Sequence, residues 1–307
     1  MKRFVLVIVA VIAVGVIGVT AFAQSSIFDR YDVNMTDWAQ LPADAPWGGE
    51  TSMVAADGKG TVIVVVREAP HFRVLTTDGE YVKSWGEAGS FGMAHSVHFD
   101  GDGNIWASDP IDHVVHKFDS DGNLLMTLGE RGVSGDNTSR DHFNQPNYVA
   151  FGANGDVFVS DGYRNSRVVQ FTGTGDFVRI IGGVRGSGFG ELMLPHGVAI
   201  DSEGRVLVSD SDNKRISVFD SEGQFIETWD APTRGGIAVA PDDTVYVSDV
   251  NGGAVTILKD GQMVDVIRVE GRPHGLGLDP VTLDVYTSSS VKTSPNITKS
   301  VPREAGN

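Results

Sequence analysis

The stretch LMLPHGVAIDSEGRVLVSDSDNKRISVFD, from Leu192 to Asp220, contains the unit from which the fold follows. It reads as an apolar strand, a Glu203-Gly204 turn, a second apolar strand ending at Ser209-Asp210, a polar loop, and a third strand ending at Phe219. A further turn leads into a fourth strand that ends at Trp229. Short strands joined by turns with glycine in second place are hairpins. Four such strands in a row predict one antiparallel sheet.

The same pattern recurs along the chain. A single small sheet buries too little apolar surface to offset the entropy of ordering its chain, so the copies must pack against one another. A sixth, less regular copy begins near Arg272. Self-similarity at about 40 to 50 residues with four strands per repeat is typical of a β-propeller. The equivalent turns lie at Asp57-Gly58, Asp102-Gly103, Asn154-Gly155 and, without glycine, Asp242-Asp243.

We therefore expect an all-β protein, a six-bladed β-propeller with four antiparallel strands per blade. Residues 24–50 are predicted to close the ring by pairing with the last blade, because closure removes open sheet edges. Residues 51–301 are the propeller, and residues 302–307 are a tail. The expected blades are 51–89, 91–132, 143–186, 192–232, 233–271 and 272–301.

The first 23 residues have the features of a secretory signal peptide. Lys2-Arg3 precedes an apolar run from Phe4 to Val19, and Ala21-Phe22-Ala23 supplies a small-x-small cleavage site. We expect a secreted or periplasmic protein, and an uncleaved membrane anchor is the alternative.

The charge and the cysteine content restrict the classes of partner and metal ligand that we expect. Removal of Lys2 and Arg3 would leave 22 basic against 40 acidic residues, a balance of −18. Such a surface repels nucleic acid and anionic lipid, so we expect neither as a partner, and no membrane contact beyond an N-terminal anchor. The chain has no cysteine, so any metal must be held by His, Asp or Glu. We expect a monomer that acts on a small-molecule or peptide substrate.

Histidine occupies the start of the first strand in alternate blades, at His95, His196 and His274. The same position is Asn147 in the third blade and Gly235 or Gly236 in the fifth. In a closed six-bladed ring this places three imidazoles about 120° apart around the axis. Three histidines with an open fourth position are the ligand set of a catalytic zinc. The alternative is a chance register among eight histidines; the other five are interpreted as surface or packing residues: His71, His98, His113, His116 and His142.

The second strand of each blade ends at the face where the first begins, because hairpin strands are antiparallel. The residues after these strands should therefore surround the same mouth. Arg67 stands where other blades have Ser-Asp, and Tyr163 follows the Asp161-Gly162 pair of the third blade; we interpret both as functional. The aspartates are interpreted as structural, because each can accept hydrogen bonds from loop N–H groups. They are Asp109, Asp161, Asp210 and Asp249.

The segment DGYRNSR from Asp161 to Arg167, followed by VVQF, with Pro195-His196 and Pro273-His274, resembles the peptidyl-α-hydroxyglycine α-amidating lyase family. Members of that family are six-bladed propellers of the NHL type. The likeness extends from about Arg67 to Asp279. Its specific part is the DGYxNSR segment, since the NHL strand pattern is shared by many binding scaffolds.

The resemblance implies a zinc-dependent carbon–nitrogen lyase. It places the zinc ligands on His95, His196 and His274, the catalytic tyrosine on Tyr163 and the active-site arginine on Arg67. The implied reaction cleaves a carbinolamide into a peptide amide and glyoxylate. Zinc would bind the substrate and acidify its hydroxyl, Tyr163 would accept that proton, and Arg67 would hold the carboxylate or stabilise the tyrosinate. Zinc and Arg67 together would lower the pKa of Tyr163 from its reference value near 10.

Several positions depart from the family pattern. Arg272 replaces a methionine, Ser211 replaces a second arginine, and Arg164 replaces a cysteine. Gly275 replaces an aspartate that ligates structural calcium in the family, which argues against calcium here. The substrate of this chain is therefore left open.

Two other functions fit the same sequence. A non-catalytic NHL propeller would bind a peptide, glycan or protein partner. A lactone-hydrolysing propeller is less favoured, because those enzymes use carboxylate and Asn ligands where this chain has His.

Overall fold

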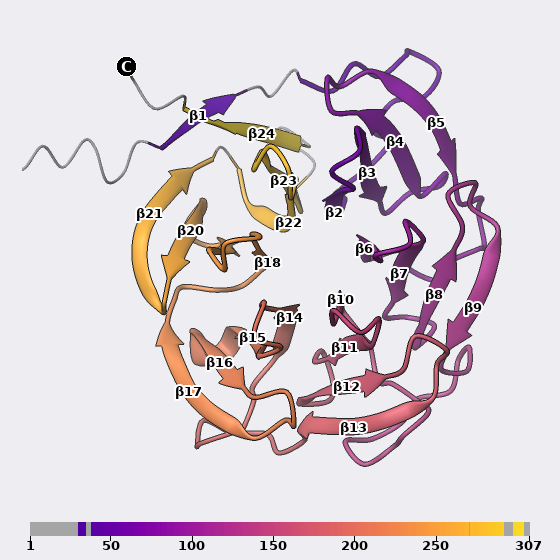
Figure 1. Cartoon of the computed structure of the whole chain (residues 1–307). Helices are drawn as coiled ribbons and strands as arrows, with labels where there is room; N and C mark the ends of the chain where they lie inside the picture. Colours follow the sequence, from indigo (N-terminus) through magenta and orange to yellow (C-terminus); the bar gives the residue numbers. More distant parts are fainter. Residues whose placement is uncertain (1–29, 35–37, 270, 292–296, 304–307) are drawn as a thin grey trace, which may run out of the picture.

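The computed structural model describes residues 30–34, 38–269, 271–291 and 297–303. These residues form six four-stranded antiparallel sheets that stand as blades around a central axis (Figure 1). The predicted all-β fold, a six-bladed β-propeller with four antiparallel strands per blade, is confirmed. The predicted signal peptide, residues 1–23, lies outside the described residues. Within the described ranges no helix has the length and hydropathy that a membrane span requires.

Each blade runs from an inner strand at the axis to an outer strand at the rim. Blade 1 consists of β2 (Thr51–Ala56), β3 (Thr61–Val66), β4 (Phe72–Thr76) and β5 (Tyr81–Trp85). Blade 2 consists of β6 (Ser96–Phe99), β7 (Ile105–Asp109), β8 (Val114–Phe118) and β9 (Leu124–Leu128). Blade 3 consists of β10 (Tyr148–Phe151), β11 (Val157–Asp161), β12 (Arg167–Phe171) and β13 (Phe177–Gly182).

The remaining blades follow in chain order. Blade 4 consists of β14 (Pro195–Ile200), β15 (Val206–Asp210), β16 (Arg215–Phe219) and β17 (Phe225–Asp230), with a short 3-10 helix η2 (Ser211–Asn213) between β15 and β16. Blade 5 consists of β18 (Ile237–Val239), β19 (Val245–Asp249), β20 (Ala254–Lys259) and β21 (Gln262–Arg268). Blade 6 consists of β22 (Pro273–Leu278), β23 (Val285–Ser289), β24 (Ile297–Pro302) and β1 (Tyr31–Asn34).

The outer strand of blade 6 comes from the other end of the chain. β1 pairs antiparallel with β24, with Tyr31 opposite Pro302 (Figure 1). The Tyr31 hydroxyl lies 2.8 Å from that of Tyr246 in blade 5. Strand β24 includes Pro302, where the sequence predicted the start of the tail, and Arg303 forms an ion pair with Asp32 at 2.6 Å. Residues 304–307 lie outside the described residues.

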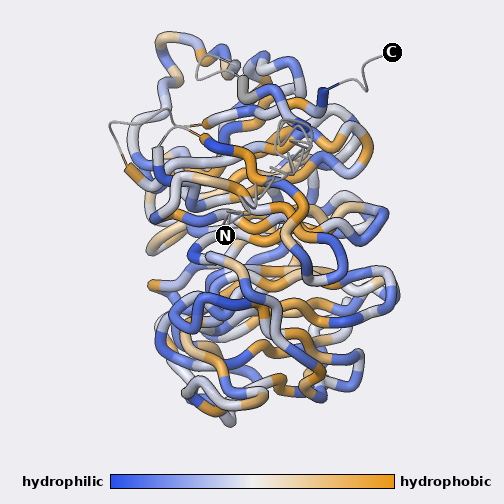
Figure 2. Tube along the Cα trace, turned by 90° about the vertical axis from the view of Figure 1, so that its left-hand side faces the viewer, coloured by the Kyte–Doolittle hydropathy of each residue, from blue (hydrophilic) through white to orange (hydrophobic). Residues whose placement is uncertain are grey.

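The hydrophobic core lies between neighbouring blades. Middle strands such as β11 and β15 are buried at every position, because a sheet covers each of their faces. Aromatic residues fill one inter-blade space: Phe72 of blade 1 stacks on Trp85 with centroids 4.0 Å apart and also contacts Phe118 of blade 2. Figure 2 shows apolar segments within the strands and hydrophilic segments mainly at the turns. The hydrophobic core is thus divided among the interfaces between neighbouring blades of the closed ring.

The aspartates that end the second strands act as structural acceptors, as predicted. Asp109 Oδ1 accepts hydrogen bonds from the N–H groups of Ile111 and Asp112, and Asp249 accepts one from Asn251. These bonds satisfy loop donors that would otherwise be unpaired next to the core.

In blades 3 and 4 the same aspartate also forms an ion pair with the first residue of the next strand. Asp161 and Arg167 lie 2.9 Å apart with both side chains fully buried, and Asp210 and Arg215 lie 2.8 Å apart. Each arginine also donates to backbone carbonyls of the long loop that precedes its blade: Arg167 to Ser139 and His142, and Arg215 to Ser187, Gly188 and Glu191. The two arginines, fixed by their ion pairs with buried aspartates, therefore anchor the two long loops at the mouth of the propeller.

We predict that Asp161→Ala lowers the free energy of unfolding by about 3–5 kcal/mol, because it leaves the Arg167 guanidinium buried without its counter-charge. The measurement is chemical denaturation of the variant and the unchanged protein. A matched control is Glu222→Ala, which removes the exposed partner of Arg179 and should cost about 1 kcal/mol or less. Equal losses for the two variants would contradict the assigned role of the buried pair.

Candidate metal centre

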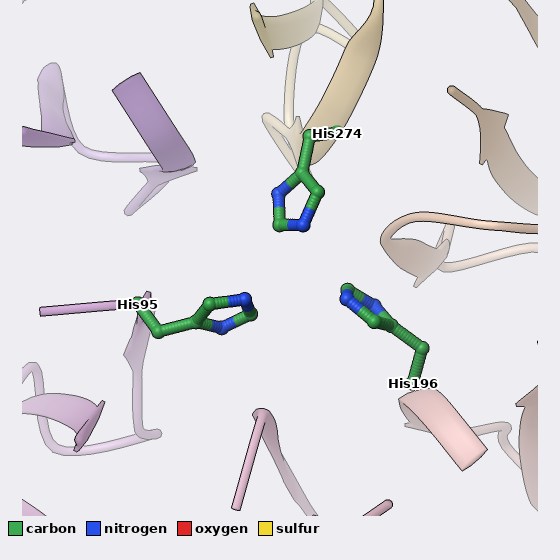
Figure 3. Close-up of side chains that lie close together, drawn as sticks. All are labelled: His95, His196 and His274. Atoms are coloured by element: carbon green, nitrogen blue, oxygen red, sulfur yellow. The ribbon is translucent and has the colours of Figure 1, made fainter. Parts of the chain in front are cut away.

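Three histidines from alternate blades converge at the axis. His95 directly precedes β6 in blade 2, His196 is the second residue of β14 in blade 4, and His274 is the second residue of β22 in blade 6. Their ligand atoms all lie within 4.8 Å of one another. Figure 3 shows the three imidazoles pointing from separate strands toward a common point. The structure therefore brings together all three residues that the sequence singled out.

A backbone carbonyl of the next blade holds each imidazole. Nδ1 of His95 donates to the carbonyl of Asn147 at 3.0 Å. Nδ1 of His196 donates to Gly235 at 3.2 Å, and Nδ1 of His274 donates to Ser52 at 2.8 Å. With the proton on Nδ1, the lone pair of each ring is on Nε2, which is the form that binds a metal ion.

These contacts also settle the equivalent position in blade 5. The sequence left it open between Gly235 and Gly236. Because Gly235 accepts from His196 as Asn147 accepts from His95, Gly235 is the equivalent residue. A Cβ at Gly235 would lie 2.2 Å from the Ser248 hydroxyl oxygen and 2.8 Å from the His274 carbonyl oxygen, so no side chain fits there.

The environment keeps all three imidazoles neutral. Burial is the largest cause, and it lowers the pKa of His196 to about 3 and that of His274 to about 4. Burial also lowers the pKa of His95 well below its usual range, with a further contribution from the other two histidines. Neutral imidazole is the ligand form, so the donor set fits a divalent cation such as zinc.

Tyr163 lies against the histidines. Its hydroxyl donates to Nε2 of His95 at 2.7 Å and lies 3.2 Å from Nε2 of His196. Burial raises the pKa of Tyr163 to about 12, while the charges of Arg67 and Arg234 act in the opposite direction. The two guanidinium groups therefore do not by themselves produce the lowered pKa that the sequence analysis expected from zinc and Arg67 together.

The loop that carries Tyr163 is fixed by two contacts that the sequence did not reveal. The side-chain oxygen of Asn147 accepts a hydrogen bond from the N–H of Gly162 at 3.0 Å. A Cβ at Gly162 would lie 1.9 Å from the Pro195 carbonyl oxygen, so the loop packs directly on the start of β14. Asn147 thus has the blade position of a ligand but orients the tyrosine loop. The indication that the sequence offered for this role is that Asn147 occupies the same blade position as the three histidines.

Arg67 lies close enough for its charge to lower the pKa of all three histidines. Its side chain is engaged elsewhere: Nη1 donates to the Met93 sulfur at 2.7 Å, and Nε lies 3.5 Å from a Glu50 carboxylate oxygen. Among the described residues, the hydrogen-bond partners of the Tyr163 hydroxyl are histidines. Arg67 therefore acts on Tyr163 through its charge in this arrangement.

Two further arginines reach the site and were not singled out as functional from the sequence. The charge of Arg234 lowers the pKa of Tyr163 and His196, and that of Arg272 lowers the pKa of His274. Arg234 directly precedes Gly235, and Arg272 lies two residues before His274. The sequence could have indicated them, because both lie within two residues of the blade position that holds the histidines.

The axis beyond the histidines is hollow. Residues from all six inner strands line a cavity of about 240 Å³ there. The Tyr148 hydroxyl crosses the axis and donates to the Ile237 carbonyl of blade 5 at 3.0 Å. A Cβ at Gly275 would lie 2.5 Å from the Met53 Cα, so no carboxylate fits at the position where the resembling family has a calcium ligand.

Comparison with known proteins identifies NHL repeats in the chain. Residues 143–171 and 192–219, which span blade 3 and blade 4 strands, match the NHL repeat family. The chain is 28% identical over 269 residues to NHL repeat-containing protein 3 of Mus musculus, which covers 78% of this chain and 76% of that protein.

Lyases are among the relatives as well. The chain is 33% identical over 149 residues to a probable peptidyl-alpha-hydroxyglycine alpha-amidating lyase of Caenorhabditis elegans, covering 48% of this chain and 42% of the relative. A solved gluconolactonase of Xanthomonas campestris superposes with a TM-score of 0.68 at 14% identity, covering 92% of this chain and 94% of that one. At that identity the structural likeness shows the fold alone. The chain is thus an NHL-repeat propeller with homology to amidating lyases over part of its length.

We predict that the protein binds one divalent cation per chain and that His95→Ala weakens zinc binding by more than about 100-fold. Loss of a residue that merely orients a ligand typically costs 10- to 100-fold, and a ligand should cost more. The measurement is competition with a chromophoric chelator. His142→Ala is the matched control, since His142 pairs with the exposed Asp141, and it should bind zinc like the unchanged protein. Equal zinc affinity in both variants would contradict the assigned ligand set.

Proposed function

We propose that the protein is an exported, metal-dependent lyase that cleaves an α-hydroxyglycine-type amide into an amide and glyoxylate. The observation that carries this proposal is the contact between the Tyr163 hydroxyl and Nε2 of His95, at 2.7 Å, inside a cluster of three neutral imidazoles. The phenol oxygen thus lies directly beside the Nε2 atoms that would bind the metal, and a bound metal ion would replace the hydrogen bonds that Tyr163 makes to them. Partial homology to amidating lyases supports the same reaction. Export rests on the leader-like sequence of residues 1–23.

The reaction needs one proton removed and one proton delivered. The carbinol hydroxyl loses its proton, and its oxygen forms the carbonyl of glyoxylate. The carbon–nitrogen bond breaks, its electron pair stays on nitrogen, and nitrogen takes up a proton to give the amide. Water is not consumed, so the site has to position a base and exclude competing solvent rather than activate a nucleophile.

The residues of this chain fit those tasks. His95, His196 and His274 would hold zinc, and Tyr163 would accept the hydroxyl proton and return it to nitrogen. A divalent ion bound there would acidify a hydroxyl that it contacts and, by its charge, lower the pKa of the adjacent phenol. Arg67 would stabilise the tyrosinate through its positive charge.

A non-catalytic propeller that binds a peptide, glycan or protein partner is the second candidate. It is favoured by the greater coverage of the match to NHL repeat-containing protein 3, compared with the match to the lyase. Lactone hydrolysis has weaker support, since the axial groups here are imidazoles. A non-catalytic binding function does not explain why three neutral imidazoles and a tyrosine lie together at the axis. The lyase reaction uses all four side chains.

We predict that the zinc-loaded protein releases glyoxylate from α-hydroxyhippurate and that Tyr163→Phe lowers kcat by at least about 100-fold, because general-base catalysis typically contributes 10²- to 10⁴-fold. Glyoxylate is measured as its phenylhydrazone. The zinc content of Tyr163→Phe should match that of the unchanged protein, since the phenol is not a ligand in this proposal.

Tyr81→Phe is the matched control, because Tyr81 is on the outer strand of blade 1 and its hydroxyl lies 2.9 Å from that of Ser84. It should keep full activity. Glyoxylate release that survives in Tyr163→Phe would show that the base is misassigned. No release from the zinc-loaded, unchanged protein would favour the binding scaffold.

A further inference from the structure

The three arginines whose charges act on the histidines and Tyr163 come from one side of the ring. Arg67 follows β3 in blade 1, Arg234 precedes β18 in blade 5, and Arg272 precedes β22 in blade 6. Blades 5, 6 and 1 are consecutive in the closed ring (Figure 1). Tyr163 follows β11 in blade 3, which is opposite blade 6. The cations and the phenol therefore approach the histidines from opposite sides.

The equivalent positions in blades 2, 3 and 4 carry no charge. The two residues before the histidine position are Met93-Ala94 in blade 2, Gln145-Pro146 in blade 3 and Leu194-Pro195 in blade 4. Ala or Pro stands directly before the histidine position in blades 2 to 4, whereas Arg234 stands there in blade 5. The histidine position of blade 5 is Gly235, which has no side chain. In a chain of net charge −16, this clustering of cations produces a local positive field at the mouth.

The three arginines differ in how firmly they are already paired. Arg67 lies 3.5 Å from Glu50 and is three-quarters buried. Arg234 is half exposed, at 52%, and has an Asp212 oxygen 3.5 Å away. Arg272 is exposed and has a neutral partner, the Asn251 side-chain oxygen at 3.4 Å. Arg234 and Arg272 can thus turn toward a ligand without leaving a buried carboxylate unpaired.

We propose that Arg234 and Arg272 form the anion-binding side of this site and hold the carboxylate of the substrate, while Arg67 serves Tyr163. The inference rests on the proposed function for the identity of that carboxylate. Blade 5 and blade 6 are joined directly beneath the two residues, because the Gly236 N–H donates to the His274 carbonyl at 3.0 Å. A carbon that bears both a carboxylate and a hydroxyl would then present its hydroxyl to the histidines and Tyr163.

The test compares two inert probes that differ only in charge. Hippurate carries the carboxylate without the reactive hydroxyl, and hippuramide replaces the carboxylate with a neutral amide. We expect the zinc-loaded protein to bind hippurate at least about tenfold more tightly by calorimetry, because hydrogen bonds to charged groups are the stronger class. Arg234→Gln and Arg272→Gln should each reduce that preference, and the double variant should abolish it. The preference should also fall with added salt.

Arg179→Gln is the matched control, because Arg179 is on the outer strand of blade 3 and forms an ion pair with Glu222. This variant should keep the preference for hippurate. The inference is overturned if the double variant still prefers hippurate, which would mean that the metal or Arg67 holds the carboxylate. It is also overturned if the unchanged protein shows no preference or binds neither probe. Failure of the lyase proposal looks different: the hippurate preference would be intact, but α-hydroxyhippurate would yield no glyoxylate. If the lyase is active, the double variant should raise KM by a larger factor than it lowers kcat, since Arg234 also acts on Tyr163 through its charge.

Discussion

The site depends on a hydrogen bond that each histidine donates from Nδ1 to a backbone carbonyl of the next blade. These bonds join blade 2 to blade 3, blade 4 to blade 5, and blade 6 to blade 1. Serine hydroxyls make a parallel set of contacts, with Ser108 donating to the Asn147 carbonyl and Ser160 to the His196 carbonyl. The imidazoles can converge only if the blades keep their angular positions. The pairing of β1 with β24, which completes blade 6, is therefore also a condition for the geometry of the metal centre.

Burial sets the chemistry of the centre. Three imidazoles held close together in a low-dielectric site favour the neutral form, because each proton added would be unsolvated and near other positive charge. The same burial keeps Tyr163 protonated, so the phenol and the imidazoles share hydrogen bonds. A divalent cation bound to the neutral imidazoles would replace the hydrogen bonds from Tyr163 to Nε2 and, by its charge, lower the pKa of the adjacent phenol. The arginines across the mouth add a positive field that is suited to an anionic substrate.

Much of the fold could be predicted from the sequence because each blade repeats local signals. The turns at Gly103, Gly155 and Gly204 have positive φ angles, as their hairpins require. In blade 5 Asp243 adopts this conformation at φ 63° without glycine, which is why that copy looked degraded. The register of His95, His196 and His274 was visible for the same reason. The Asn147 contact with Gly162 and the arginine anchors of the long loops were not, because they depend on how loops pack against strand ends in three dimensions. The approach of Arg234 and Arg272 to the site was not visible either, because it depends on adjacency between blades 5 and 6.

The most direct test of the central claim is X-ray absorption at the zinc edge of the zinc-loaded protein. The structure predicts a first shell with three imidazole nitrogens at about 2.0–2.1 Å and one further light ligand. Imidazole scattering should fall to two rings in His274→Ala. A first shell of carboxylate oxygens, or a spectrum that is unchanged in that variant, would contradict a metal centre built from every second blade of the ring.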